Sequence, residues 1–287
     1  MHPKKQLFLE QLVNHLSQVP GIMAIVLGGS YASGTYRENS DLDVGLYYHE
    51  NEPFPIVEIK RIAESISVQG IPVVTDFYEW GPWVNGGAWI QTDVGKVDFL
   101  YRNFDQVEWT IEDAYQGIVQ HDYDQQPTYG FYSVIYLAET HICIPLHDPY
   151  SEIARLKQRV EIYPSKLKEK LVVEALWSAE FTLGFAKSFA AAGDVYNTVG
   201  CLTRIASNLT QALFALNERY FISDKRVMDT IAAFSILPSG YVNQITGILA
   251  RPGGMVEEMS RTVINLEAVW QSVVSLAGEM YQPKFRT

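Results

Sequence analysis

The sequence predicts an α+β protein in which a mixed sheet with helices packed on it is followed by an all-α helical bundle. Its 287 residues suit two domains of very roughly 150 residues each. Short apolar runs typical of strands are concentrated near the amino terminus, whereas long segments with a 3.6-residue period dominate the rest. We therefore expect a sheet domain over residues 1–103 and a helical domain over residues 104–287.

The sheet domain is predicted to begin with a helix. Residues 1–16 are typical of an amphipathic helix rather than a signal peptide, because Glu10, Gln11 and Asn14 interrupt the apolar stretch. Apolar runs bounded by glycine-rich turns follow. We expect strands at 24–27, 41–48, 73–78, 89–92 and 96–101, with a helix at 57–68.

The second half of the chain is predicted to be all helical. Its apolar residues recur with the helical period, and Asp148 before Pro149 is a typical helix start signal. The expected helices span 108–118, 132–141, 153–160, 166–192, 195–218, 227–234 and 255–280.

Composition narrows the classes of partner. The chain carries 22 Lys and Arg against 33 Asp and Glu, and neither predicted domain is basic, which disfavours nucleic acid as a partner because backbone binding needs positive charge. Cys143 and Cys201 lie far apart without metal-binding spacing, so we expect a reduced, cytoplasmic setting. No run approaches the roughly 18 apolar residues that a membrane span needs.

Residues 28–44, GGSYASGTYRENSDLDV, carry the clearest chemical signal. Strand alternation places Asp41 and Asp43 on one face. Two neighbouring carboxylates repel one another unless a cation lies between them. Magnesium suits such a pair, because it accepts one or two carboxylates and completes its shell with water and phosphate oxygens. The pair therefore predicts a magnesium site.

A phosphate-binding turn is predicted beside this site. Gly28 and Gly29 allow the backbone to approach a ligand, and a helix beginning near Ser30 would direct free N–H groups at an anion. Asp98, in the strand pattern GKVDFLYR, is the expected third carboxylate. A Gly-Gly-Ser turn or an Asp-x-Asp pair alone is more often structural, so the prediction depends on their combination and spacing.

With Gly34, Thr35 and Ser40 at intermediate positions, the segment resembles the signature of the DNA polymerase β-like nucleotidyltransferase superfamily. That signature is GG[ST], then Gly-Thr, then [ST]-D-x-D, with a third acidic residue on a later strand. The resemblance covers about residues 22–102. It implies transfer of a nucleoside monophosphate from a nucleoside triphosphate to an acceptor hydroxyl, with release of pyrophosphate.

The resemblance also implies roles for individual residues. Asp41, Asp43 and Asp98 would hold two magnesium ions, and Asp98 would bind the ion that activates the acceptor. The phosphate-binding turn would be formed by Gly28, Gly29 and Ser30, with Gly29 and Ser30 on the β and γ phosphates, while Ser40 supports the neighbouring turn.

The helical half resembles, in architecture and length, kanamycin-type nucleotidyltransferases whose helical domain completes the acceptor pocket. Residues 104–287 would then be an acceptor-binding domain. A catalytic glutamate is not placed: Glu139, Glu174 and Glu180 are candidates, each weighed against an ordinary helix-surface role. Lys225 is a candidate triphosphate contact, with a solvated basic turn as the alternative.

Aromatic residues near the predicted strand ends have two interpretations. Trp80, Trp83 and Trp89 lie around the segment GPWVNGGAW. They could line the mouth of a substrate site or serve as packing residues. Both interpretations stay open from the sequence.

Three functions stay open. The first is an enzyme that nucleotidylates a small hydroxylated molecule, such as an aminoglycoside-like compound. The others are a non-catalytic nucleotide-binding regulatory protein and a protein-modifying, AMPylating nucleotidyltransferase. The complete carboxylate set favours an enzyme, and the long helical half disfavours the protein-modifying class. The identity of the nucleoside triphosphate and a homodimeric state are also open.

Overall fold

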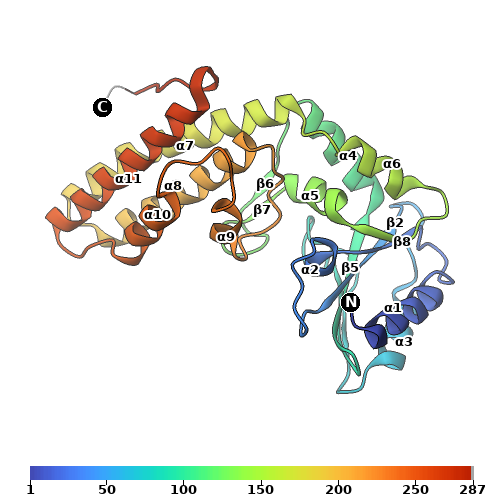
Figure 1. Ribbon diagram of the computed structural model, residues 1–287. Helices are drawn as coiled ribbons and strands as arrows, with labels where there is room; N and C mark the ends of the chain where they lie inside the picture. The colour runs from blue at the N-terminus through green and yellow to red at the C-terminus, as the bar shows by residue number, and fades with distance from the viewer. Residues whose placement is uncertain (286–287) are drawn as a thin grey trace. The chain divides into compact units, whose positions relative to one another are not determined.

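The computed structural model describes residues 1–285, and a six-stranded mixed sheet organises its first part (Figure 1). The strand order is β3-β4-β5-β2-β1-β8. Strands β2 and β5 are parallel, whereas the other neighbouring pairs are antiparallel. The strands are β1 Ala24–Leu27, β2 Leu42–Tyr48, β3 Val73–Val74, β4 Gly87–Thr92, β5 Gly95–Asn103 and β8 Ile144–His147. The predicted mixed sheet is confirmed.

Helices α1 (Pro3–Leu16) and α3 (Ile56–Ile66) contribute to a core with one face of this sheet. Their buried side chains recur at helical spacing, and β2 supplies alternate residues such as Leu42 and Val44. Because successive strand residues point to opposite faces, burying Leu42 and Val44 directs Asp43 to the other face. The apolar pattern therefore determines where this acidic side chain lies.

The first compact unit extends beyond the boundary predicted at residue 103. It comprises residues 1–113 and 120–162, and the second unit comprises 114–119 and the chain from residue 163 on. Strand β8 pairs with β1 and so belongs to the central sheet. The other elements after β5 are α4 Phe104–Tyr115, β6 His121–Asp122, β7 Phe131–Tyr132, α5 Val134–Ile142 and α6 Glu152–Arg159. The expectation of helices alone after residue 103 is therefore wrong for β6, β7 and β8.

A buried ion pair holds α5 to the sheet. Arg102 of β5 donates from Nε and Nη2 to the two carboxylate oxygens of Glu139, at 2.7 and 2.8 Å. Arg102 is 5 % exposed. Because a buried guanidinium is costly without a paired acceptor, this contact ties α5 to the sheet.

The second unit is helical, as predicted. Helices α7 (Ser165–Ala191), α8 (Val195–Leu216) and α11 (Val256–Ala277) pack together through apolar side chains. Shorter elements complete it: α9 Val227–Ile231, α10 Tyr241–Ala250 and η1 Gly278–Met280. None of the helices within residues 1–285 combines the length and apolar character needed to cross a membrane.

A buried glutamate fastens the carboxyl-terminal segment to α7. Glu180 is 3 % exposed. Its carboxylate accepts hydrogen bonds from the Tyr281 hydroxyl, from the Lys284 backbone N–H at 3.0 Å and from the Phe285 N–H at 2.6 Å. These contacts give Glu180 a structural role, so the structure does not support it as a general base.

Replacing Glu180 should destabilise the helical unit. We expect Glu180→Ala to lower the free energy of unfolding by about 3 kcal/mol, because it leaves three donors without their charged acceptor. Glu174→Ala on the same helix is the control, since Glu174 forms only an exposed ion pair with Lys170 and should change stability by less than about 0.5 kcal/mol. Urea unfolding measures both; equal effects would contradict the role of Glu180.

Candidate active site

The parallel register of β2 and β5 places two carboxylates side by side. Asp43 is the direct partner of Asp98. Val97 and Phe99 point into the core, so the side chain of Asp98 between them points to the opposite face of the sheet. Asp43 lies on that same face, which we call the non-core face. Asp41 lies one residue before β2 begins. The structure therefore brings the three predicted aspartates together near the start of β2, in the middle of the sheet.

Lys96 joins these carboxylates and was not singled out from the sequence. Its Nζ lies 2.8 Å from Asp98 Oδ2 and 3.6 Å from Asp41 Oδ2. Partial burial opposes the charged lysine, yet hydrogen bonding to Asp98 and its charge outweigh burial and raise the pKa of Lys96. Burial raises the pKa of Asp98, although Lys96 counteracts this. Residues two apart in a strand share a face, so Lys96 lies on the same face as Asp98. That spacing could have identified Lys96 as a partner of Asp98 from the sequence.

The donor chemistry of these residues fits magnesium. Asp98 Oδ1 is buried without a hydrogen-bond partner, and a buried carboxylate oxygen requires a partner. The three aspartates offer only oxygen ligands, which magnesium prefers. Within residues 1–285, however, no three His, Cys, Asp or Glu side chains already have the arrangement of a metal site. Metal binding would therefore require the aspartates to adjust and Lys96 to yield its contacts.

The Gly-Gly-Ser turn lies directly against this cluster. Gly28 donates its N–H to the carbonyl of Asp43 at 2.8 Å. Gly29 has a φ of 56°, and a Cβ there would lie 1.8 Å from Asp43 Oδ2. Only glycine accommodates both the positive φ and this approach. Ser30 lies in α2, a single turn over Gly29–Ala32, so the predicted helix is short and offers free N–H groups rather than a long dipole.

A buried lysine on α1 supports the loop between the turn and the aspartates. Lys5 donates from Nζ to the Tyr31 hydroxyl at 3.1 Å and to the Ser40 carbonyl at 2.7 Å. The Ser40 hydroxyl accepts the N–H of Arg37 at 2.8 Å. Ser40 thus closes the turn before Asp41. The sequence does not predict this role of Lys5, because a lysine at a polar position of an amphipathic helix is normally exposed.

The candidate glutamates have other partners. Glu139 is engaged by Arg102, and Glu174 forms an ion pair with Lys170 at 2.6 Å. With Glu180 holding the carboxyl-terminal segment, the structure assigns no general base among the three. Lys225 is an exposed residue between α8 and α9 in the second unit, and its part in phosphate binding stays a prediction.

The three tryptophans separate into two environments. Trp80 and Trp89 stack with ring centroids 4.9 Å apart. Trp83 instead stacks on Phe131 at 5.4 Å and contacts Trp109 edge-on. Trp83 is therefore a packing residue, whereas the other two form a separate indole pair.

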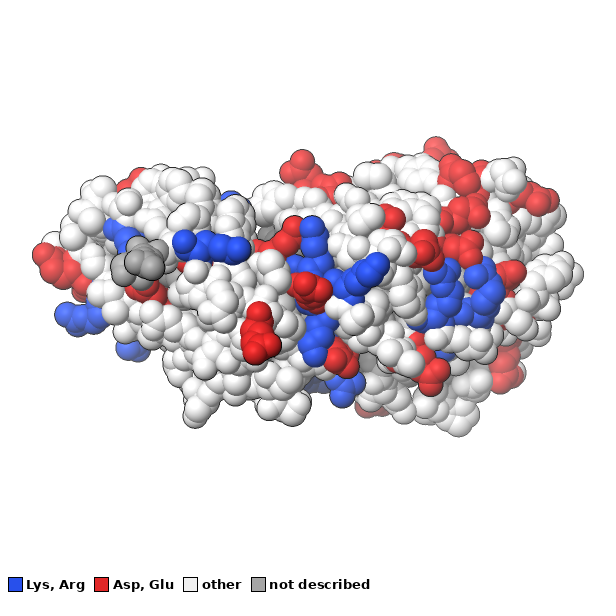
Figure 2. All heavy atoms as spheres, turned by 90° about the horizontal axis from the view of Figure 1, so that it is seen from above, with Lys and Arg blue, Asp and Glu red and all other residues white. Residues whose placement is uncertain are grey.

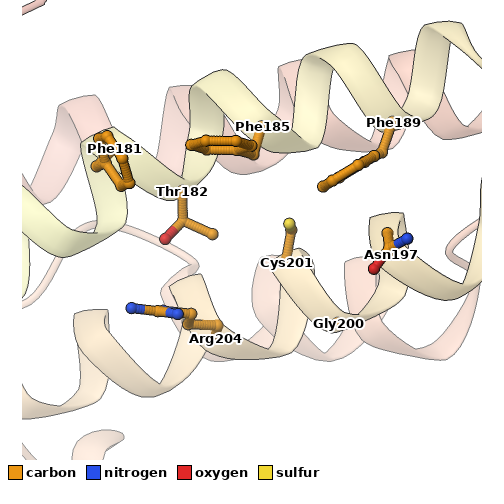
Figure 3. Close-up of a pocket in the computed structure, with 8 residues that line it drawn as sticks. All are labelled: Phe181, Thr182, Phe185, Phe189, Asn197, Gly200, Cys201 and Arg204. Carbon is orange, nitrogen blue, oxygen red and sulfur yellow. The ribbon is translucent and has the colours of Figure 1, made fainter.

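The helical unit contains an open, aromatic-lined pocket of about 420 Å³ (Figure 3). The phenylalanine rings come from one face of α7 and point towards Cys201 and Arg204 of α8. Its lining includes no carboxylate, so its chemistry differs from that of the aspartate cluster. The lining residues are Phe181, Thr182, Phe185, Phe189, Asn197, Gly200, Cys201 and Arg204.

Charges of both signs are interleaved on the face shown in Figure 2. Ion pairs also join basic and acidic side chains in the first unit, where Arg155 contacts Glu108 at 2.7 Å and Glu152 at 2.8 Å. Nucleic-acid backbones are bound by concentrated positive charge. The coloured residues on this face form no such extended basic area.

Two regions of the chain match models of known protein families. Residues 9–89 match the family described as "Nucleotidyltransferase domain". Residues 135–225 match a domain of unknown function, DUF4037. A search of curated proteins finds no significant match.

Two solved structures show distant similarity. A nucleotidyltransferase-like protein from Exiguobacterium sibiricum 255-15 has a TM-score of 0.47 and 9 % identity, over 95 % of this chain and 78 % of the other. An aminoglycoside 6-adenyltransferase from Bacillus subtilis has a TM-score of 0.37 and 11 % identity, over 97 % and 91 % of the two chains.

Removing the Lys96 charge should strengthen metal binding. We expect Lys96→Met to tighten Mn²⁺ binding to the nucleotide-free protein by about fivefold, because the lysine competes for Asp41 and Asp98 and a partly exposed pair contributes about 1 kcal/mol. Isothermal titration measures the affinity. Lys4→Met, which removes an exposed pair with Asp93, is the control and should leave it unchanged. Unchanged or weaker binding to Lys96→Met would refute the competition.

Proposed function

We propose that the chain, whose residues 9–89 are a nucleotidyltransferase domain, transfers a nucleoside monophosphate from a nucleoside triphosphate to a hydroxyl of a small molecule. The reaction forms a phosphate ester with the acceptor oxygen and releases pyrophosphate. The single observation that supports it most strongly is the contact between the glycine turn and the paired carboxylates. Gly29 leaves no room for a Cβ beside Asp43, and Asp43 is the register partner of Asp98.

Each part of the site has a proposed task. The N–H groups of Gly29 and Ser30 bind the β and γ phosphates, with Gly28 setting the turn. Asp41, Asp43 and Asp98 hold two magnesium ions; when bound, magnesium neutralises the phosphate charge and makes the acceptor hydroxyl more acidic. Positioning and charge compensation account for most catalysis in phosphoryl transfer, so this residue set needs no covalent nucleophile.

The remaining assignments are also proposals. Residues 1–103 contain the catalytic machinery, and residues 104–287 contribute acceptor binding, with an aminoglycoside-like compound as the candidate acceptor. Lys225 provides a point charge for the triphosphate. We assign no general base, because Glu139 and Glu180 already serve as hydrogen-bond acceptors within their own units.

Neutralising each aspartate tests the site. Asp41→Asn, Asp43→Asn and Asp98→Asn should each lower kcat by about a thousandfold or more, because each removes a charge that phosphoryl transfer requires. Pyrophosphate release measures turnover, and thermal unfolding verifies the fold. Asp93→Asn, an exposed aspartate in the β4–β5 turn, should retain normal turnover. Normal turnover in any of the three site variants would show that its assignment is wrong.

Nucleotide titration separates an enzyme from a binding protein. We expect one or more of ATP, GTP, CTP and UTP to bind only with Mg²⁺ and to release pyrophosphate with a hydroxylated acceptor. Isothermal titration followed by an acceptor panel measures both steps. Absence of metal-dependent binding would refute the proposal. Binding without pyrophosphate release across small molecules and proteins would favour the non-catalytic alternative.

A further inference from the structure

A stacked pair of indoles, one exposed and one half-buried, lies beside the carboxylate cluster. The Trp89 side chain is 49 % exposed although it lies within β4. It stacks on Trp80 with ring centroids 4.9 Å apart and ring planes 26° apart. Aromatic rings of this size are usually buried, and the exposed Trp89 ring, backed by the half-buried Trp80, offers an apolar surface for binding. Its role therefore depends on what lies next to it.

The strand register connects Trp89 to the carboxylates. Trp89 is the direct partner of Asp98 across β4 and β5, and Asp98 is the partner of Asp43 across β5 and β2. Direct partners in neighbouring strands project from the same face. Trp89, Asp98 and Asp43 consequently form a row across the non-core face of the sheet.

The strand order gives this row a direction. The glycine turn follows β1, which lies on the opposite side of β2 from β5 and β4. The order along the sheet is thus phosphate turn, Asp43, Asp98 and Trp89. In phosphoryl transfer the attacking and leaving oxygens lie roughly in line on opposite sides of phosphorus. With pyrophosphate at the turn, the attacking hydroxyl approaches from the side of Trp89.

Trp80 is held in place before any ligand binds. Its backbone N–H donates to the carbonyl of Asn85 at 2.9 Å. Asn85 is fully buried and donates from its side chain to the Pro82 carbonyl at 3.2 Å. A Cβ on Gly87 would lie 2.9 Å from Trp80 Cζ3, so the glycine makes room for the ring. This preorganisation lowers the entropy cost of binding.

From these observations we propose that Trp89 and Trp80 form the acceptor subsite, and that the acceptor is a hydroxylated ring that places an apolar C–H face on the indoles. The indole face contacts the ring, while the row directs one ring hydroxyl towards Asp98. This inference rests on the proposed nucleotidyl transfer. It gives the two tryptophans a positioning role and limits the acceptor to molecules with a flat, ring-shaped apolar face.

Probe binding to the full chain with Mg²⁺ and a nucleotide tests the subsite. The ring probe is neamine, a two-ring aminocyclitol glycoside, and the open-chain comparison is mannitol. We expect neamine to bind and mannitol not to bind. Trp89→Ala should raise the neamine dissociation constant about tenfold, equivalent to about 1.4 kcal/mol, while Trp89→Phe retains part of the affinity. Isothermal titration measures both probes and the nucleotide.

The control is Val57→Ala, which shortens an apolar side chain that is 68 % exposed on α3, the helix that packs on the core face of the sheet, away from the row. It should leave neamine binding unchanged, and Trp89→Ala should change nucleotide affinity by less than about twofold. The subsite is refuted if Trp89→Ala binds neamine with normal affinity, or if both variants weaken neamine binding equally. The same holds if Trp89→Ala lowers the affinity for the nucleotide instead of the affinity for neamine. It is also refuted if neamine fails to bind wild-type protein that binds the Mg²⁺–nucleotide. Failure of Mg²⁺–nucleotide binding itself would refute the proposed function.

Discussion

The pairing of β2 with β5 is the constraint on which the rest of the site depends. It places Asp43 beside Asp98, while Val44 pairs with Phe99 on the buried face. A slip of one residue would bury the acidic side chains and expose the apolar ones, so the hydrophobic core enforces the register. The same pairing aligns Trp89 with Asp98. Core packing on one face thus determines the chemistry available on the other.

Much of this arrangement could be predicted from local sequence. Alternation predicted that Asp43 opposes its apolar neighbours, and a Gly-Gly-Ser turn after a strand predicted a close backbone approach. The short strands β6, β7 and β8 escaped prediction, because two to four residues are too few to show a strand period. The contacts of Lys5 and Lys96 depend on loop positions and strand register, which composition and periodicity do not specify.

Lys96 offsets part of the negative charge of the carboxylate cluster. The net charge of −11 disfavours polyanionic partners, yet Lys96 places a cation between Asp41 and Asp98. A buried carboxylate is stabilised by such a partner, and a metal requires the same oxygens. Lys96 therefore serves as a counter-ion to Asp41 and Asp98 within the chain. In the proposed reaction a metal ion would compete with Lys96 for these oxygens.

In the proposed function the three aspartates bind two metal ions beside a nucleotide. Electron paramagnetic resonance of Mn²⁺ with a non-hydrolysable nucleoside triphosphate analogue tests it most directly, because manganese accepts the same oxygen ligands as magnesium. Two ions roughly 3.5 to 4 Å apart should give a spin-coupled signal. We expect two coupled Mn²⁺ ions per chain and loss of the coupling in Asp98→Asn. Uncoupled Mn²⁺, or coupling that persists in Asp98→Asn, would contradict it.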